Sequence, residues 1–290
     1  MRLVSYLDGG IERVGIDQGG RIRSVESLVP GGPRTMGQLL EAGQGTLARL
    51  DLASDVPRSD IGHRIEDVEL LSPIPRPGKV VAVGLNYRDH AAEGGREAPE
   101  APVLFAKFPT AVIGPDAEIR WDPALTQAVD FEAELAVVIG RACRRVSAAA
   151  ALDHVLGYTC LNDVTARDLQ FADKQFVRAK SLDTFCPMGP AVVTPDEVPD
   201  PQALAIRCLV NGEVMQEAST ADMIHGVADL VAFCSQAFTL EPGDVIATGT
   251  PSGVGWYRDP KRLLHAGDEV VVEIDSIGRL RSVCREELAD

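Results

Sequence analysis

Long apolar runs are absent from this sequence. No stretch of its 290 residues approaches eighteen consecutive apolar residues, which is about the length that a membrane-spanning helix needs. Residues 1–15 are interrupted by the pair Gly9-Gly10 and lack the apolar core of a signal peptide. These absences argue against a membrane-embedded protein, and we expect a cytoplasmic location.

Closely spaced cysteine pairs are also missing. The chain has six cysteines, none in Cys-x-x-Cys spacing, and several stand inside apolar stretches such as residues 231–238. Scattered cysteines in a chain of this length are typical of small buried hydrophobic residues in a reducing compartment. A zinc site built on cysteine is therefore not expected.

Positive charge is scarce. Lysine and arginine number 28 against 43 aspartates and glutamates, so the formal net charge is −15. Such a surface repels phosphate backbones, and nucleic acid is not an expected partner. Any pocket for a small organic acid must then be made locally positive by a bound cation or by a group of lysines and arginines. The sequence has no Gly-x-Gly-x-x-Gly after an expected strand, which disfavours a dinucleotide-dependent oxidoreductase.

The first part of the chain reads as a small β-rich unit. Residues 1–70 contain short alternating segments separated by glycine-rich turns, with one short helix expected within residues 35–53. Residues 70–80 contain three prolines, which exclude a helix and predict an extended linker. We therefore predict an N-terminal domain at residues 1–72 and a catalytic domain at residues 73–290.

The second part is expected to be dominated by strands. Two helices are predicted, one starting near Thr165 and one within residues 221–238. The pair Asn211-Gly212 predicts a type I′ hairpin. Strands are expected at residues 80–86, 102–108, 131–140, 154–162, 204–212, 213–218, 244–250 and 268–275. The fold class is therefore α+β, with a mixed, β-dominated sheet structure.

Two glutamates stand two positions apart in a segment expected to be a strand. Because side chains alternate along a strand, Glu132 and Glu134 point to the same face, with their Cα atoms about 6.5 Å apart. Two carboxylates on one face repel each other and lose hydration, and a shared cation removes that cost. The alternative is an exposed strand edge on which both acids are hydrated.

A third carboxylate ends the strand expected at residues 154–162. Thr165 and Asp168 have the spacing of a capping box, which would place Asp163 between a strand end and a helix start. Plain helix capping is the alternative for Asp163. Together, three oxygen donors suit a hard cation such as Mg²⁺ or Mn²⁺ and leave further positions for water and substrate.

A histidine and a glutamate open a polar segment, residues 89–102, that resembles a lid. On a helical turn His90 and Glu93 lie side by side. The carboxylate would then fix the tautomer of the imidazole and raise its basicity, as general-base catalysis requires. The glycines at 94 and 95 are a candidate hinge. An exposed histidine beside a glutamate is the alternative.

Two further segments carry groups that suit an anionic substrate. Lys180 could stabilise an enolate or oxyanion, or it could be a solvated loop lysine. Residues 248–255 are glycine-rich, and their N–H groups could bind a carboxylate, although a turn without ligand fits equally. They do not match a P-loop, because no Lys-Ser/Thr pair follows the glycines.

From about residue 75 onward the chain resembles the fumarylacetoacetate hydrolase family. The matching segments are GLNYRDH with AAE, VDFEAELAVVIG, NDVTARDLQ, AKSLDTFCPMGP, LVNGEVMQ and PGDVIATGTPSGVG. The C-terminal part is most similar to the domain-containing-protein branch of that family. The resemblance implies a rolled, β-rich fold, a homodimer and Mg²⁺ held by Glu132, Glu134 and Asp163.

The same resemblance implies roles for other side chains. His90 and Glu93 would be the lid dyad that activates water or moves a proton, and Lys180 would stabilise developing negative charge. The residues expected to shape the substrate site or bind the substrate are Arg167, Gln170 and Thr250.

Three functions are compatible with these residues. The first choice is hydrolysis of a 2,4-dioxo acid such as an acylpyruvate, in which Mg²⁺ chelates the 2-oxo acid and His90 with Glu93 activates water. The alternative is a decarboxylase, or an enol–keto tautomerase or isomerase, of oxaloacetate-type or 2-hydroxymuconate-type 2-oxo acids. A non-catalytic metal-binding scaffold is the third, and it predicts that replacing His90 changes nothing measurable.

Overall fold

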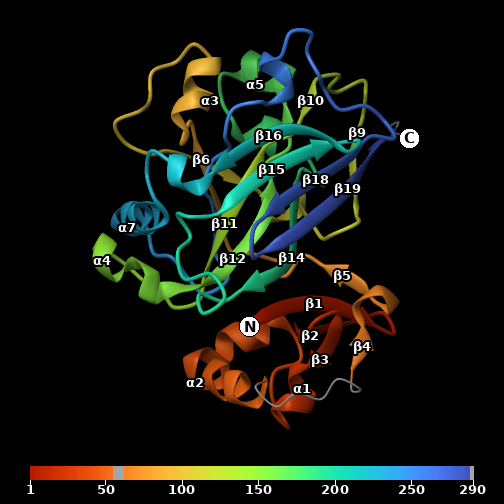
Figure 1. The fold of residues 1–290 in the computed structure, drawn as a ribbon, viewed down its shortest axis with the longest axis vertical. Helices are drawn as coiled ribbons and strands as arrows, with labels where there is room; N and C mark the ends of the chain where they lie inside the picture. Colours follow the sequence, from red (N-terminus) through yellow and green to blue (C-terminus); the bar gives the residue numbers. More distant parts are fainter. Residues whose placement is uncertain (55–61, 288–290) are drawn as a thin grey trace.

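The computed structural model describes residues 1–54 and 62–287 and has a small N-terminal unit beside a larger body (Figure 1). Within the described residues, the unit holds five strands and two helices: β1 (Arg2–Asp8), β2 (Ile11–Asp17), β3 (Arg21–Ser24), α1 (Val25–Leu28), α2 (Met36–Ser54), β4 (His63–Arg64) and β5 (Glu69–Leu71). The helix expected at residues 35–53 is thus confirmed as α2, with a break at Gly43. The β-rich character of this unit is also as expected.

The body holds the remaining strands and helices. Its strands are β6 (Val80–Gly84), β7 (Val103–Lys107), β8 (Val112–Ile113), β9 (Glu118–Trp121), β10 (Val129–Asp130), β11 (Ala133–Ile139), β12 (Val155–Asn162), β13 (Thr165–Ala166), β14 (Cys186–Val193), β15 (Ala205–Val210), β16 (Glu213–Ser219), β17 (Val245–Ala247), β18 (Glu269–Ile274) and β19 (Gly278–Glu286). Its helices are α3 (Arg88–Glu93), α4 (Ala148–Ala151), α5 (Arg167–Asp173), α6 (Val177–Lys180) and α7 (Val227–Ala237). The α+β, strand-rich fold class is confirmed.

Two large sheets pack against each other. The described strands of the larger sheet follow the order β4-β3-β2-β1-β14-β12-β11-β17-β6-β7, and a smaller sheet follows β16-β15-β18-β19-β9. The smaller sheet lies across β11 and β12 (Figure 1), and buried side chains from both sheets, including Leu135 and Ile206, form one apolar cluster. Every residue of β11 is buried, as expected for a strand covered on both faces. Acidic side chains on β11 are therefore held in the interior.

The N-terminal unit is joined to the body by backbone pairing as well as by packing. Strand β1 pairs with β14, and Leu3, Met36 and Val80 belong to one buried cluster that spans both parts. The division at residues 72–73 stays a prediction, because β5 in the linker region pairs back onto β1. Within the described residues, no helix has the length and apolarity needed to cross a membrane.

Two local expectations have different outcomes. The Asn211-Gly212 hairpin is confirmed: the φ values are 52° and 80°, as a type I′ turn requires. The capping box at Thr165 is wrong, because Thr165 lies in β13 and α5 begins two residues later, without a side-chain cap. The Thr165 hydroxyl instead donates to the carbonyl oxygen of Asp163, and Asp168 accepts a hydrogen bond from the Thr126 hydroxyl.

All six cysteines are buried and free. This agrees with their reading as small apolar residues. Burial raises the pKa of the Cys160 thiol above its usual value, so it is not a reactive thiolate at neutral pH.

Candidate active site

Three acids from two neighbouring strands meet at one point in the interior. Glu134 belongs to β11, Glu132 directly precedes that strand, and Asp163 directly follows β12. The pairing of β11 with β12 brings them together, and the backbone N–H of Asp163 donates to the carbonyl oxygen of Glu132 at 2.9 Å. One carboxylate oxygen from each residue lies within 4.8 Å of the other two. All three side chains are buried, so the reading as a hydrated strand edge is wrong.

Three cations compensate most of this buried negative charge. Lys180, at the end of α6, places its Nζ 2.7 Å from Glu132 Oε2 and 2.6 Å from Asp163 Oδ2. Arg167 places Nη2 2.7 Å from Glu132 Oε1, and Lys107 places Nζ 2.5 Å from Asp163 Oδ1. Partners of this kind offset the cost of burying the carboxylates.

The two glutamates differ in electrostatic surroundings. Burial raises the pKa of Glu132, but Lys180 and Arg167 outweigh it and lower that pKa to about 2. Burial and the negative charges of Asp163 and Glu132 raise the pKa of Glu134 well above its usual value. Only the backbone N–H of Gly249, at 2.9 Å, donates a hydrogen bond to Glu134 among the described residues.

This charge distribution fits a divalent cation. Glu134 is a buried carboxylate without a direct cationic partner in the described part of the chain, and a metal ion would supply that partner. The donor set is all oxygen, which suits Mg²⁺ or Mn²⁺ better than softer metals. The acidic triad is therefore consistent with a divalent metal site.

The predicted histidine–glutamate pair is formed. Nδ1 of His90 lies 2.7 Å from Glu93 Oε1 on helix α3, and Glu93 Oε2 accepts a hydrogen bond from the N–H of Gly253 at 2.9 Å. His90 is buried and lines the cavity that contains the acidic triad. With Nδ1 engaged by Glu93, Nε2 is the ring nitrogen left for a substrate.

The other predicted residues line the same cavity, but with different contacts. The Arg167 guanidinium contacts Asp130 and Glu132 and donates to Gln170 Oε1 at 3.0 Å. It therefore orients other side chains. The hydroxyl of Thr250 donates to the carbonyl oxygen of Ala133, and its oxygen accepts from Gln216. Its proton is thus already engaged within the protein.

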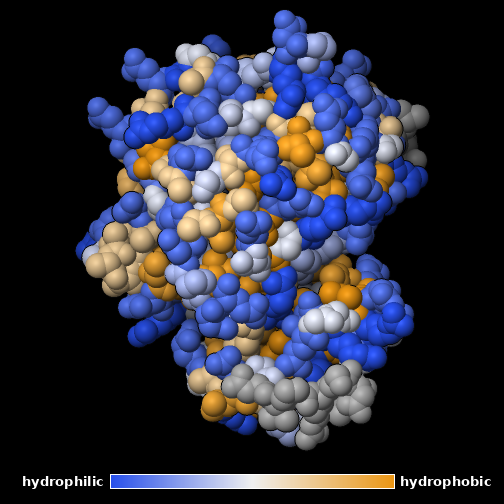
Figure 2. Space-filling model, viewed as in Figure 1, coloured by the Kyte–Doolittle hydropathy of each residue, from blue (hydrophilic) through white to orange (hydrophobic). Residues whose placement is uncertain are grey.

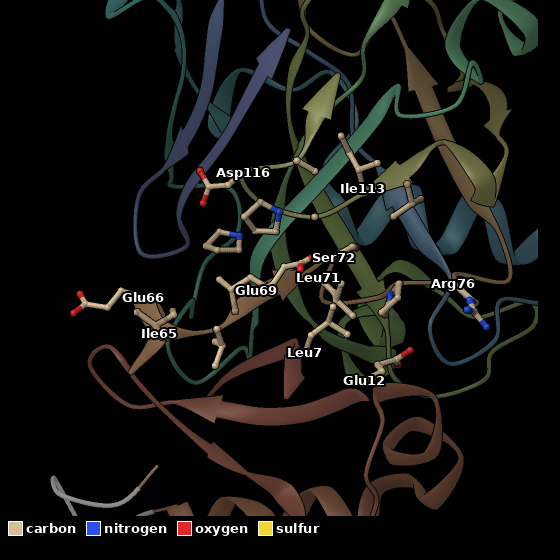
Figure 3. Close-up of a pocket in the computed structure, with 18 of the residues that line it drawn as sticks. Leu7, Glu12, Ile65, Glu66, Glu69, Leu71, Ser72, Arg76, Ile113 and Asp116 are labelled. Carbon is tan, nitrogen blue, oxygen red and sulfur yellow. The ribbon is translucent and has the colours of Figure 1, made fainter. Parts of the chain in front are cut away.

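The cavity over the triad is small, about 40 Å³. Its walls combine the acids and cations with aromatic rings. The centre of the Phe105 ring lies 5.2 Å from Lys180 Nζ, and Phe176 packs edge-on against Phe105. A larger cavity of about 1000 Å³ lies between the N-terminal unit and the body. Figure 3 shows Glu66 and Asp116 apart from each other there, with Arg76 on the opposite side. Among the described residues that line this larger cavity, no set of reactive side chains converges.

Several residues of the site were not predicted from the sequence. Lys107 is fully buried, and its Nζ also donates to the carbonyl oxygens of Val164 and Lys180. Its only signal is a lone lysine in the apolar stretch 102–108. Asp130 accepts hydrogen bonds from the N–H groups of Gly255 and Trp256. Arg178, two residues before Lys180, pairs with Asp173 at the surface and takes no part in the site.

A buried oxygen-donor triad and a histidine–glutamate dyad, facing each other on a rolled β-rich fold, define a class of metal-dependent enzymes. Residues 79–285 match the family model described as Fumarylacetoacetate (FAA) hydrolase C-terminal. The chain therefore belongs to the fumarylacetoacetate hydrolase family, and it is a metal-dependent enzyme of that family.

Curated relatives and a solved structure agree with this assignment. The chain is 46% identical over 264 residues to the mitochondrial oxaloacetate tautomerase FAHD2A of Homo sapiens, covering 90% of this chain and 82% of that protein. It is also 46% identical over 230 residues to the oxaloacetate tautomerase YisK of Bacillus subtilis (strain 168), covering 77% and 76%. The fumarylacetoacetate hydrolase of Exiguobacterium antarcticum superposes with a TM-score of 0.86 at 38% identity, covering 99% and 100%.

Proposed function

We propose that this enzyme catalyses the keto–enol tautomerisation of an oxaloacetate-type 2-oxo acid. The observation that carries the proposal is the dyad of His90 and Glu93, which leaves one imidazole nitrogen for proton transfer beside the acidic triad. The names of the human and Bacillus subtilis relatives favour this reaction over the hydrolysis expected first from the sequence.

In the proposal, Glu132, Glu134 and Asp163 hold Mg²⁺, or alternatively Mn²⁺. When bound, the ion would supply Lewis acidity at the 2-oxo acid end of the substrate. The protein prepares this site by keeping the three carboxylates in place: Asn162 accepts from the N–H of Glu132 and Gly249 donates to Glu134.

His90 is proposed as the group that moves the proton. Conversion of the enol to the ketone removes one proton from the enol oxygen and adds one proton at C3, and nothing else is lost or gained. Glu93 holds Nδ1 and stabilises the imidazolium when Nε2 takes a proton. The Gly253 N–H keeps Glu93 in position for this task.

Lys180 is proposed to stabilise negative charge on the enolate. Burial lowers its pKa, but Asp163 and Glu132 outweigh burial and raise it above the usual value. The side chain is therefore an ammonium at neutral pH, and a positive charge beside a developing oxyanion lowers its energy. The centre of the Phe105 ring lies 5.2 Å from this ammonium group, which adds a cation–π contact.

Arg167, Gln170 and Thr250 complete the proposed substrate site. Arg167 holds Glu132 and Gln170 in place, which leaves the amide nitrogen of Gln170 as a donor toward the cavity. Thr250 contributes to the cavity wall beside Glu134, with its side chain fixed by Ala133 and Gln216.

Hydrolysis of an acylpyruvate is the second candidate. The same dyad could activate water for attack on the C4 carbonyl group, and the structurally similar Exiguobacterium antarcticum protein is named a hydrolase. Hydrolysis differs from tautomerisation in an observable way, because it releases a carboxylic acid and a pyruvate.

One assay separates these candidates. The Mg²⁺-loaded protein is mixed with the enol form of oxaloacetate, with acetylpyruvate and with fumarylpyruvate, while enol absorbance and released pyruvate are followed. We expect the enol of oxaloacetate to disappear without pyruvate formation. H90Q should lower kcat about 100-fold, the usual size of a general-base contribution, and the exposed-histidine control H265Q should not.

Other outcomes are equally clear. Release of pyruvate and an acid from the dioxo acids favours hydrolysis, and CO₂ from oxaloacetate favours decarboxylation. Decay of the enol at the buffer rate, with none of these products, contradicts the proposal.

For the whole molecule we propose a homodimer in the cytoplasm, with a small 2-oxo acid as its partner and no nucleic acid. The dimer proposal is supported by an exposed apolar edge of the larger sheet at β7. The exposed fractions of Val103 and Phe108 there are 37% and 53%.

A further inference from the structure

Three cationic side chains line the cavity above the acidic triad, and they differ in their partners. Arg167 and Lys180 are paired with buried carboxylates. Arg96, which follows α3 in the lid segment, is exposed at the mouth of the cavity. Among the described residues, its guanidinium has no ion pair and no hydrogen bond. It is therefore a cation at the site whose charge the protein itself does not neutralise.

Two other hydrogen-bond donors at this cavity lack an acceptor in the described part of the chain. The amide nitrogen of Gln170 is one, since only its oxygen is engaged, by Arg167. The hydroxyl of Tyr257 is the other. The Tyr257 ring lies edge-on to His90 with centroids 6.4 Å apart, and it packs against Gly94, two residues before Arg96. Arg96, Gln170 and Tyr257 thus offer donors around the mouth, while the carboxylates lie at the base.

This polarity suits a substrate with negative charge at both ends. A 2-oxo acid placed with its oxo group over the triad would direct its distal end toward the mouth. A chain with net charge −15 repels a dianion at long range, so the second carboxylate needs a local positive group. A guanidinium is the side chain best suited to bind a carboxylate through two parallel hydrogen bonds.

We propose that Arg96 is a specificity-determining residue that binds the distal carboxylate of a dicarboxylic 2-oxo acid. The inference rests on the proposed function, because it assumes that the 2-oxo end of the substrate lies over the triad. Through this contact, Arg96 selects four-carbon and similar dicarboxylates over 2-oxo acids whose distal end is neutral. Arg96 acts on substrate binding and leaves the proton transfer to His90.

The kinetic test compares oxaloacetate with its 4-methyl ester, which has the same 2-oxo acid end but no distal charge. Both are assayed as enols with the Mg²⁺-loaded wild type, R96Q, and R88Q. The control R88Q removes an exposed arginine at the start of α3, eight residues before Arg96, that does not line the cavity. We expect R96Q to raise KM for oxaloacetate about tenfold, the size of one charge-assisted hydrogen bond, with kcat and the ester unchanged. R88Q should match the wild type.

A binding test that needs no turnover accompanies it. Thermal unfolding of the Mg²⁺-loaded protein is followed with malate, which has a distal carboxylate, and with oxalate, which fills only the metal end. We expect R96Q to lose most of the malate-induced rise in Tm and to keep the rise from oxalate.

The two arms separate the inference from the function on which it rests. Equal losses for oxaloacetate and ester, or an unchanged preference in R96Q, would overturn the role of Arg96 while tautomerisation stands. If the wild type converts neither enol, the proposed function fails. The thermal-unfolding test with malate then shows by itself whether Arg96 binds a distal carboxylate. Equal malate protection of R96Q and wild type would then reject it.

Discussion

At the scale of single residues, the two glutamates of the triad have opposite energetic roles although they are only two positions apart. Glu132 is paired with Lys180 and Arg167, so its charged form stabilises the fold. Glu134 has no direct cationic partner in the described residues, so its charged form is costly until a metal ion binds. The same side-chain chemistry therefore predicts opposite effects of the same substitution.

We predict that E132Q and E134Q change the stability of the metal-free protein in opposite directions. At pH 7.5, E132Q should lower the free energy of unfolding by about 3 kcal/mol, because buried cations lose their partner. E134Q should raise it, because an uncompensated buried charge is removed. Urea unfolding in EDTA measures both. A loss of stability in E134Q as large as that in E132Q would contradict this reading of the site.

The pH dependence of stability follows from the pKa shifts of the same two glutamates. The pKa of Glu132 is about 2, below the ordinary 4.5, so its contribution to stability is present above pH 4.5 and declines toward pH 2. The pKa of Glu134 is raised, so its protonated form favours the fold below pH 4.5, and that advantage declines as pH rises. In metal-free protein, the free energy of unfolding of E134Q relative to that of the wild type should therefore increase as pH rises. A difference that is constant with pH would contradict the raised pKa.

The sequence predicted the residues that carry local signals and missed those that depend on distant partners. The spacing of Glu132 and Glu134, and of His90 and Glu93, follows from strand and helix periodicity. Lys107 gave no such signal, because its partner Asp163 lies 56 residues away. Likewise, nothing near Arg167 in the sequence shows that Asp130 holds it.

At the scale of elements, the loop after β17 positions the metal site. Gly249 has a φ of 97°, and a Cβ there would lie 2.7 Å from the Cβ of Asn86. Only glycine fits this approach, and its N–H is the one that donates to Glu134.

We predict that G249A lowers both stability and metal affinity. The steric and backbone cost should be about 2 kcal/mol or more, and displacement of the N–H should weaken Mg²⁺ binding measured by calorimetry. G267A is the matched control, since Gly267 also has a positive φ, 88°, with nothing within 4 Å of the added Cβ. It should lose about 1 kcal/mol and bind Mg²⁺ normally. Equal effects of both variants on affinity would refute the positioning role.

Element boundaries were predicted well where apolar periodicity decides them and poorly where side chains compete with it. Strand β14 was missed because Pro187, Gly189 and Pro190 lie within it, and such residues argue against a strand. The start of α5 was misplaced because Thr165 and Asp168 bind groups outside the helix.

At the scale of the whole molecule, the face shown in Figure 2 is largely hydrophilic, with hydrophobic residues exposed on the body as well as near its junction with the N-terminal unit. A second apolar region, an open cleft of about 380 Å³, lies along the edge strand β7 and includes Phe108 and Phe238. An apolar edge strand of this kind is a surface on which another chain can pair or pack.

We predict that β7 contributes to the homodimer interface. The wild type should sediment at twice the chain mass of 31.0 kDa, and F108E should shift the equilibrium toward single chains because it places charge in an apolar contact. F171E, at an exposed phenylalanine on α5, is the control. A dimer that F108E leaves intact would place the interface elsewhere.

The central claim is that one divalent ion, held by the acidic triad, enables proton transfer on a 2-oxo acid. The most direct measurement is the rate of enol-oxaloacetate conversion while metal-free protein is titrated with Mg²⁺. We predict a rise from the buffer rate to a plateau at one ion per chain, reversal by EDTA, and no rise in E134Q. A full rate in EDTA-treated wild-type protein, or normal metal-dependent conversion by E134Q, would contradict the account.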